Sequence, residues 1–107
     1  MRVEFHPKAR TEIRSAARWY EEHRSGLGEE FAKEISTALD GIEEAPLSFP
    51  LWPGTRGAAR AIRKATVKRF PYLIGFEVHE DYLLVIAVAH AKRRPLYWLT
   101  RAGQEPS

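Results

Sequence analysis

The apolar residues of this sequence change their spacing at one place, a stretch rich in proline and glycine at residues 46–57. Before it, they recur every three or four positions, which is typical of amphipathic helices. After it, β-branched and aromatic residues become frequent from Ile62 onward, which is typical of strands. A helical half and an extended half must bury their apolar faces against each other, so the pattern indicates an α+β fold.

Two helices are predicted in the first half of the chain. Pro7 suits the start of the first, because the N–H that proline lacks would have no partner there, and this helix is expected to end near Arg24. A tight connection containing Ser25, Gly26 and Gly28 leads to the second helix, which stops before Pro46. We expect the two helices to pack as a hairpin. Each has one apolar stripe, made of Ala9, Ile13, Ala16, Ala17 and Tyr20 in the first and of Leu27, Phe31, Ile35, Ala38, Leu39 and Ile42 in the second.

Four strands are predicted, at residues 2–6, 61–68, 70–78 and 82–90. The fourth is apolar on both faces, which indicates a central strand covered on two sides. Residues 95–101 are expected to form a short C-terminal helix or turn. Together these elements predict a helical hairpin packed on one face of a small, mainly antiparallel sheet. Alternate residues of the third strand form one apolar face, namely Phe70, Tyr72, Ile74, Phe76 and Val78.

The length of 107 residues leaves room for one modest core, so a single domain at 1–107 is expected, with the 46–57 loop inside it and a flexible tail at 102–107. The chain has no cysteine, which excludes disulfides, thiolate nucleophiles and cysteine-ligated zinc. Its polar N-terminus does not resemble a signal peptide, and its longest apolar run is too short to cross a bilayer. We therefore expect a cytoplasmic protein that does not contact membranes.

Charge is distributed unevenly along the chain. Residues 1–55 contain seven Lys or Arg and ten Asp or Glu, whereas residues 56–107 contain ten and four. The second half therefore has an excess of positive charge, which suits phosphate groups or an acidic protein partner. The alternative is a solvated face without a partner, and for Lys68 and Arg69 the alternative is a solvated strand edge.

Most familiar catalytic and cofactor motifs are absent from the sequence. There is no phosphate-binding GxxxxGK[ST] or GxGxxG pattern, no HExxH and no Gly-x-Ser-x-Gly. The histidines lack the close spacing of a zinc pair, and the second half has few acids for a magnesium site. We expect no metal and no cofactor, so any catalysis would be metal-free.

One segment combines the residue types that chemistry on a phosphate would need. Residues 90–101 directly follow the most apolar strand and contain a histidine, four cations and two aromatics. Fixed cations could stabilise a phosphorane-like transition state, while His90 or Tyr97 could move protons. The structural alternatives are a hydrogen-bonded His90 at the edge of the core, Trp98 as a packing anchor, and Arg93 and Arg94 bound to helix-end carbonyls.

Five short blocks occur along a resemblance that covers about residues 3–101: WYEE at 19–22, GLGEEF at 26–31, RFPY at 69–72, AVAH at 87–90 and RRPLYW at 93–98, followed by Arg101. In this order and spacing they resemble the successive signatures of the ParE-like, or plasmid stabilisation, branch of the RelE/ParE toxin superfamily. The resemblance implies a β-α-α-β-β-β fold, in agreement with the elements predicted above. It also implies a type II toxin–antitoxin module with a cognate antitoxin as partner.

The resemblance leaves the target open, because one fold in this superfamily supports different activities. RelE-like members cut messenger RNA on the ribosome, and here His90, Arg93, Arg94 and Tyr97 could fill the catalytic roles, although no carboxylate accompanies His90. ParE-like members poison DNA gyrase, which requires no nucleophile, and the RFPY and RRPLYW blocks resemble that branch more. Gyrase poisoning is therefore the first hypothesis and ribosome-dependent endonuclease activity the second. A decayed toxin that binds only its antitoxin is the third.

The target-binding residues are expected among the cations and aromatics of the second half. Antitoxins of such modules resemble flexible segments that fold around the toxin as an amphipathic helix or an added strand. We expect a basic groove, bordered by these cations, to be partly covered in the complex. The expected target-binding residues are Lys68, Arg69, Arg93, Arg94, Tyr97, Trp98 and Arg101.

Overall fold

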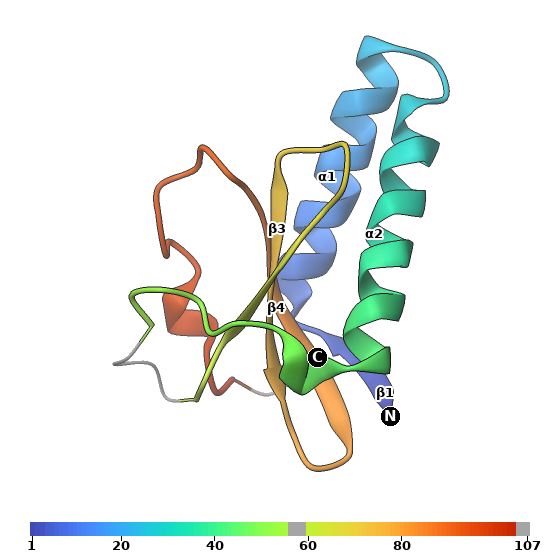
Figure 1. Cartoon of the computed structure of the whole chain (residues 1–107). Helices are drawn as coiled ribbons and strands as arrows, with labels where there is room; N and C mark the ends of the chain where they lie inside the picture. Colours follow the sequence, from blue (N-terminus) through green and yellow to red (C-terminus); the bar gives the residue numbers. More distant parts are fainter. Residues whose placement is uncertain (56–59, 105–107) are drawn as a thin grey trace.

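A four-stranded mixed sheet forms the centre of the computed structural model, which describes residues 1–55 and 60–104 (Figure 1). The strands lie in the order β1-β4-β3-β2, with bounds Arg2–Phe5 for β1, Arg63–Thr66 for β2, Tyr72–Val78 for β3 and Tyr82–His90 for β4. β1 is parallel to β4, and the other two pairs are antiparallel. The predicted α+β fold with a mainly antiparallel sheet is confirmed, and β4 lies inside the sheet as expected.

The strands β2 and β3 are shorter than the sequence indicated, because the chain turns sharply between them. The strands expected at 61–68 and 70–78 are reduced to Arg63–Thr66 and Tyr72–Val78. Arg69 has a φ of 71°, a left-handed conformation that cannot continue a strand. The N–H of Val67 donates to the carbonyl of Tyr72 at 3.0 Å and closes the turn.

The helical hairpin covers one face of the sheet (Figure 1). Helix α1 spans Pro7–His23 and α2 spans Leu27–Glu44, close to the predicted bounds. The Nδ1 of His6 accepts a hydrogen bond from the N–H of Lys8 at 3.1 Å and so caps α1. Within the residues described, neither helix is long and apolar enough to cross a membrane.

A glutamate of α1 closes the tight connection between the two helices. The carboxylate of Glu21 accepts hydrogen bonds from the N–H of Gly26 and from the N–H of Gly28, each at 3.0 Å. Gly26 has a φ of 89°, a conformation that favours glycine. Gly28 lies so close to α1 that a Cβ at this position would be 2.5 Å from the carbonyl oxygen of Ala17. The sequence Gly26-Leu27-Gly28 is therefore required by the geometry of the hairpin.

Replacing Gly28 with alanine is expected to lower the free energy of unfolding by about 1–3 kcal/mol, because the new methyl group overlaps the backbone of α1. Gly41→Ala is the matched control, since Gly41 also lies in α2 but has open space around its missing Cβ. This control should gain about 0.5–1 kcal/mol from the higher helix propensity of alanine. Urea unfolding measures both changes. Similar midpoints for the two variants would contradict the close approach of the helices.

The strand β4 is buried on both faces, and its side chains alternate between two cores except at one bulge. The register between β3 and β4 shifts between Gly75 and Phe76, which leaves Ile86 as an extra residue in β4. Val85 lies in the core under the helices, whereas Ile86 and Ala87 both lie in a second core on the opposite face. The expected covering of this strand on two sides is therefore confirmed.

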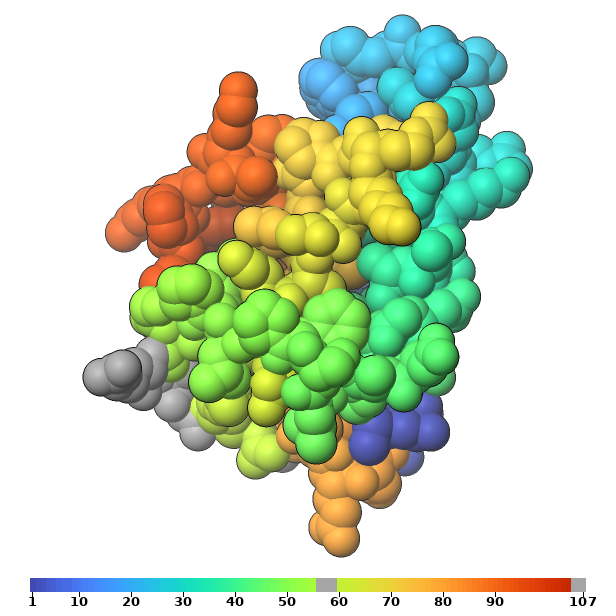
Figure 2. All heavy atoms as spheres, viewed as in Figure 1, coloured from blue at the N-terminus to red at the C-terminus, as the bar shows by residue number. Residues whose placement is uncertain are grey.

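The second core is covered by the segments before β2 and after β4. Trp52 and Trp98 contribute the two largest side chains to it. Figure 1 shows the segment after β4, in orange to red, on the side of the sheet away from the hairpin, and the green segment before β2 crossing to that side from the end of α2. Figure 2 shows the two segments as neighbours on the surface. The molecule thus has a third layer, made of segments that the sequence indicated as a loop and a C-terminal turn.

The loop and tail contain short ordered elements. The helix or turn expected at 95–101 is a 3-10 helix, η2 (Leu99–Arg101), and the 46–57 loop begins with another, η1 (Pro46–Ser48). In the tail expected to be flexible, the N–H of Gly103 donates to the carboxylate of Glu77 at 2.7 Å. Residues 56–59 and 105–107, which include the end of that loop and of that tail, lie outside the described residues.

Candidate functional site

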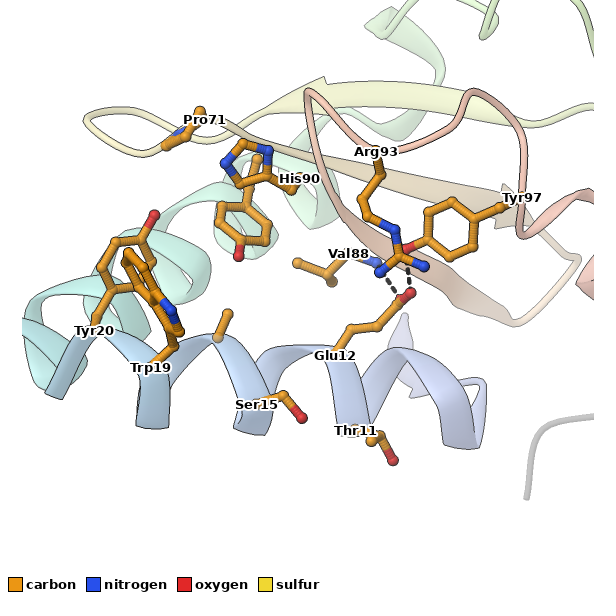
Figure 3. A pocket seen from close by; sticks show the side chains of 12 residues that line it. Thr11, Glu12, Ser15, Trp19, Tyr20, Pro71, Val88, His90, Arg93 and Tyr97 are labelled. Carbon is orange, nitrogen blue, oxygen red and sulfur yellow. Dashed lines mark hydrogen bonds between the residues drawn. The ribbon is translucent and has the colours of Figure 1, made fainter. Parts of the chain in front are cut away.

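A cleft of about 790 Å³ lies between α1 and the ends of β3 and β4 (Figure 3). It is bordered by residues 92–97, which follow β4 and which we call the basic segment. The cleft is therefore the place where the hairpin, the sheet and the cationic C-terminal part of the chain meet. Its lining residues are Thr11, Glu12, Ser15, Ala16, Trp19 and Tyr20 from α1, Pro71, Tyr72, Val88 and His90 from the sheet region, and Arg93 and Tyr97 from the basic segment.

Three of the four candidate catalytic residues, His90, Arg93 and Tyr97, line this cleft. The Nδ1 of His90 accepts a hydrogen bond from the N–H of Lys92 at 3.0 Å, so a neutral ring in this arrangement carries its proton on Nε2. The guanidinium carbon of Arg93 lies 4.2 Å from the ring centroid of Tyr97, a cation–π contact. The fourth candidate, Arg94, is exposed and does not line the cleft.

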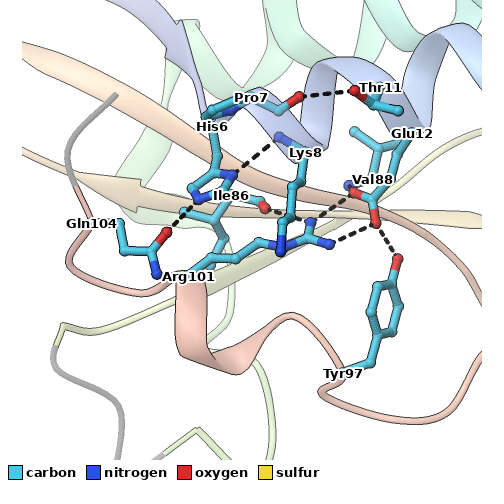
Figure 4. A network of polar contacts seen from close by, with 10 residues as sticks. All are labelled: His6, Pro7, Lys8, Thr11, Glu12, Ile86, Val88, Tyr97, Arg101 and Gln104. Atoms are coloured by element: carbon cyan, nitrogen blue, oxygen red, sulfur yellow. Dashed lines mark hydrogen bonds and ion pairs between the residues drawn. The ribbon is translucent and has the colours of Figure 1, made fainter. Parts of the chain in front are cut away.

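Glu12 of α1 is the site residue that the sequence interpretation missed (Figure 4). Its carboxylate accepts hydrogen bonds from the N–H of Val88 at 2.9 Å and from Nη1 and Nη2 of Arg101 at 3.0 and 3.2 Å. It also accepts a hydrogen bond from the hydroxyl of Tyr97. Glu12 lines the same cleft as His90, although its hydrogen bonds go to Val88, Tyr97 and Arg101.

Glu12 and Arg101 bind backbone groups of β4 beyond the end of β1. β1 pairs with only the first four residues of β4, so among residues 1–55 and 60–104 no strand lies beside the rest of β4 on that side. The carbonyl of Ile86 instead accepts a hydrogen bond from Arg101 at 3.1 Å, and the N–H of Val88 donates to Glu12. These side chains thus satisfy backbone groups that the short β1 leaves unpaired.

One signal in the sequence could have pointed to Glu12. It lies three residues after Ala9 and four before Ala16, both buried, so it shares their side of the helix. A carboxylate beside an apolar stripe requires a buried partner. That partner, Arg101, is 89 residues away, and no local pattern joins the two.

Burial raises the pKa of the Tyr97 hydroxyl above its ordinary value near 10, and the hydrogen bond to Glu12 raises it further. The unfolded chain therefore releases this proton first as pH increases. The Tyr97 hydroxyl should therefore make its full contribution to the free energy of unfolding below about pH 10, and a smaller one at higher pH. We expect Tyr97→Phe to lose less stability than the wild type over this alkaline range, as measured by urea unfolding. Burial also raises the pKa values of Tyr20 and Tyr72, but both residues are present in the wild type and in the variant. If the free energy of unfolding falls equally with pH in the two proteins, Tyr97 does not contribute to the alkaline loss.

Trp98 and Arg101 are buried, which corrects the expectation that they contact a target directly. Trp98 is 1% exposed and packs edge-on against Trp52 at a centroid distance of 4.6 Å. Arg101 is 8% exposed, and its guanidinium binds Glu12 and the backbone of Ile86. Both side chains anchor the C-terminal part of the chain, as the packing interpretation of Trp98 proposed.

Lys68 and Arg69 lie elsewhere, on the exposed turn between β2 and β3. The guanidinium of Arg69 is 2.6 Å from the carboxylate of Glu30 and 3.5 Å from that of Glu34, both in α2. The hydrogen bond from Arg69 lowers the pKa of the Glu30 carboxyl. Neither Lys68 nor Arg69 lines the cleft, so the expected basic groove is divided between two surfaces.

Three of the sequence blocks, WYEE, GLGEEF and RFPY, meet in the core beside the cleft. The ring centroid of Tyr20 lies 5.3 Å from that of Phe31 and 4.8 Å from that of Phe70. The ring centroids of Phe31 and Tyr72 are 5.1 Å apart. Aromatic side chains in such arrangements contribute strongly to core stability. Together with the bonds of Glu21 to the start of α2, these contacts explain most of the three blocks as packing. The blocks therefore indicate the fold more directly than they indicate chemistry.

A family model described as the ParE toxin of the type II toxin-antitoxin system, parDE, matches residues 3–95. The chain belongs to the ParE toxin family. A solved structure described as "Chromosomal ParDE TA system from P. aeruginosa" is similar with a TM-score of 0.67 and 15% sequence identity, over 86% of this chain and 97% of that one. At this identity the likeness concerns the fold. A comparison with curated proteins gives no match.

The family match includes Glu12, His90, Arg93 and Arg94 but ends before Tyr97. The bonds that join Glu12 to the C-terminal part of this ParE-family chain are therefore known from its structure and not from the match. Among residues 1–55 and 60–104, no three His, Asp or Glu side chains gather closely enough to hold a metal ion.

Proposed function

We propose that this ParE-family protein is a toxin that arrests bacterial growth by binding and poisoning DNA gyrase, and that a cognate antitoxin holds it inactive. Family membership supports a toxin, and the similar solved structure belongs to a ParDE system. The observation that carries the proposal is the basic segment, in which Lys92, Arg93 and Arg94 are exposed beside the cleft. Cations held on a scaffold suit an acidic protein surface or the phosphates of bound DNA.

A binding role fits the bonding in the cleft better than a catalytic role. A general base needs an available lone pair and a pKa near the working pH. The carboxylate of Glu12 already accepts four hydrogen bonds, and the pKa of Tyr97 is raised. The Nδ1 of His90 is occupied by the N–H of Lys92. None of the three is prepared to remove a proton, and a gyrase poison requires no such step.

Purified gyrase acting on supercoiled DNA provides the test. We expect cleaved DNA to accumulate with increasing amounts of the protein, and the cognate antitoxin to prevent this. If the protein arrests growth in cells but purified gyrase accumulates no cleaved DNA, gyrase is not the target.

Ribosome-dependent cleavage of messenger RNA is the second candidate, favoured by the presence of His90, Arg93 and Tyr97 in one cleft. Cations and a proton carrier are the groups that metal-free RNA cleavage needs. Mapping of transcript ends after induction distinguishes the two. New ends that depend on translation and vanish in His90→Gln would favour this candidate over gyrase poisoning.

For the antitoxin, we propose that a partly apolar, acidic segment covers the cleft. Arg93 lines the cleft and Arg94 is exposed next to it in the basic segment, so this side carries positive charge. Trp19, which is 53% exposed, gives the cleft an apolar wall. A disordered segment that folds on binding can use both kinds of contact. The basic segment would then be shared by antitoxin and target, so the antitoxin neutralises the toxin by occupying it.

A further inference from the structure

Glu12 connects three separate parts of the chain to α1 through one carboxylate (Figure 4). It binds the backbone of β4 at Val88, the hydroxyl of Tyr97 and the guanidinium of Arg101. The side chain of Glu12 is 16% exposed and that of Arg101 is 10% exposed. Charge-assisted hydrogen bonds are strong when they are so far removed from water. One side chain of the first helix therefore sets where the residues after β4 lie.

Tyr97 connects Arg93 to Glu12, because it contacts both residues. The guanidinium of Arg93 lies over the ring whose hydroxyl Glu12 holds (Figure 3). In the part of the chain that the structure describes, Arg93 takes part in no ion pair. Its position at the cleft thus depends on the ring of Tyr97, and its N–H groups remain available to a partner.

We infer that Glu12 is a positioning residue of the toxin: by holding the hydroxyl of Tyr97, it fixes Arg93 at the cleft, where the target is bound. The inference rests on the proposed function, because it assigns target contact to Arg93. A purely structural role, as one half of a buried ion pair, would be satisfied by any replacement that keeps the protein stable. A positioning role would be lost even in a stable variant, because the hydroxyl of Tyr97 would still lack its acceptor.

Two variants separate these roles. Glu12→Leu combined with Arg101→Met removes both charges together, and apolar replacement of a whole buried ion pair is often tolerated. Tyr97→Phe removes the same hydroxyl contact but leaves the ion pair intact. Glu22→Gln, an exposed position on the same helix, is the matched control. Thermal melting, growth arrest on induction and DNA cleavage by purified gyrase are measured for each variant.

We expect the double variant and Tyr97→Phe to fold and to lose growth arrest by at least about tenfold, as for loss of one well-placed interface contact. Glu22→Gln should behave as the wild type. A folded double variant with full growth arrest would overturn the inference. If the double variant does not fold, full growth arrest by Tyr97→Phe has the same consequence.

Failure of the proposed function is distinguishable from failure of this inference. If the wild type arrests growth without trapping cleaved DNA, gyrase is excluded, and the growth-arrest comparison still decides the role of Glu12. If the wild type does not arrest growth, the proposed function fails and amide hydrogen exchange decides instead. The backbone of residues 92–97 should exchange faster in both variants than in the wild type, and equal exchange would overturn the inference.

Discussion

Replacing Trp98 with alanine is expected to lower the free energy of unfolding by about 3–5 kcal/mol. The side chain is 1% exposed and packs against Trp52 in the second core. Its removal leaves a cavity under the segment that follows β4 and takes away the largest anchor of that segment. Because small domains are stable by only about 5–15 kcal/mol, this loss should leave a measurable unfolded fraction at growth temperature.

Trp19→Ala provides the control for this prediction. Trp19 is 53% exposed and stacks on His23 at a centroid distance of 3.7 Å, so its removal should cost less than about 1 kcal/mol. Thermal denaturation of the two variants compares the same chemical change at a buried and at an exposed site. Equal melting temperatures would mean that Trp98 does not anchor the C-terminal part of the chain.

Replacing Arg93 and Arg94 together with alanine is expected to weaken target engagement by at least about 2 kcal/mol, or roughly thirtyfold in affinity. Both side chains are exposed at the basic segment, so the protein should keep its melting temperature. The dose of protein needed for DNA cleavage by gyrase gives the measurement. Affinity for the antitoxin should fall as well, most strongly at low salt, because screening weakens contacts between exposed charges.

The matched control removes the same charge from the helices, by Arg14→Ala with Lys33→Ala. Both positions are exposed, and neither lines the cleft. An equal loss of gyrase activity in this control would mean that net charge matters and the basic segment does not. Unchanged activity in the Arg93 and Arg94 variant would mean that the target contacts another surface, of which the turn at Lys68 and Arg69 is the first to examine.

The helices could be predicted from the sequence because their signals are local. The hydrogen bonds of a helix join residues four apart, and its apolar stripe repeats over the same distance. Pro7 at the start of α1 and Gly26 between the helices mark the boundaries by backbone geometry alone. The central position of β4 could be predicted too, since a strand that is apolar at every position must be covered on both faces.

The candidate site could be predicted only in part. The sequence located the cations and aromatics of residues 90–101 correctly as a group of interest, and His90, Arg93 and Tyr97 do share a cleft. It could not separate these from Trp98 and Arg101, which are neighbours in the sequence but are buried. Exposure of successive residues in an irregular segment follows no period, so no pattern distinguishes an anchor from a contact residue.

By itself, the sequence determined the fold family, the two helices, the inner strand and the cationic character of the segment after it, because these follow from composition and from spacings of a few residues. Only the tertiary structure decided which cations share a surface and that Glu12 holds Tyr97 and Arg101. Those contacts span more than eighty residues, and they depend on where β1 ends beside β4. The partners of Glu12 depend on which backbone groups the sheet leaves unpaired, and the sheet forms only when the whole chain folds.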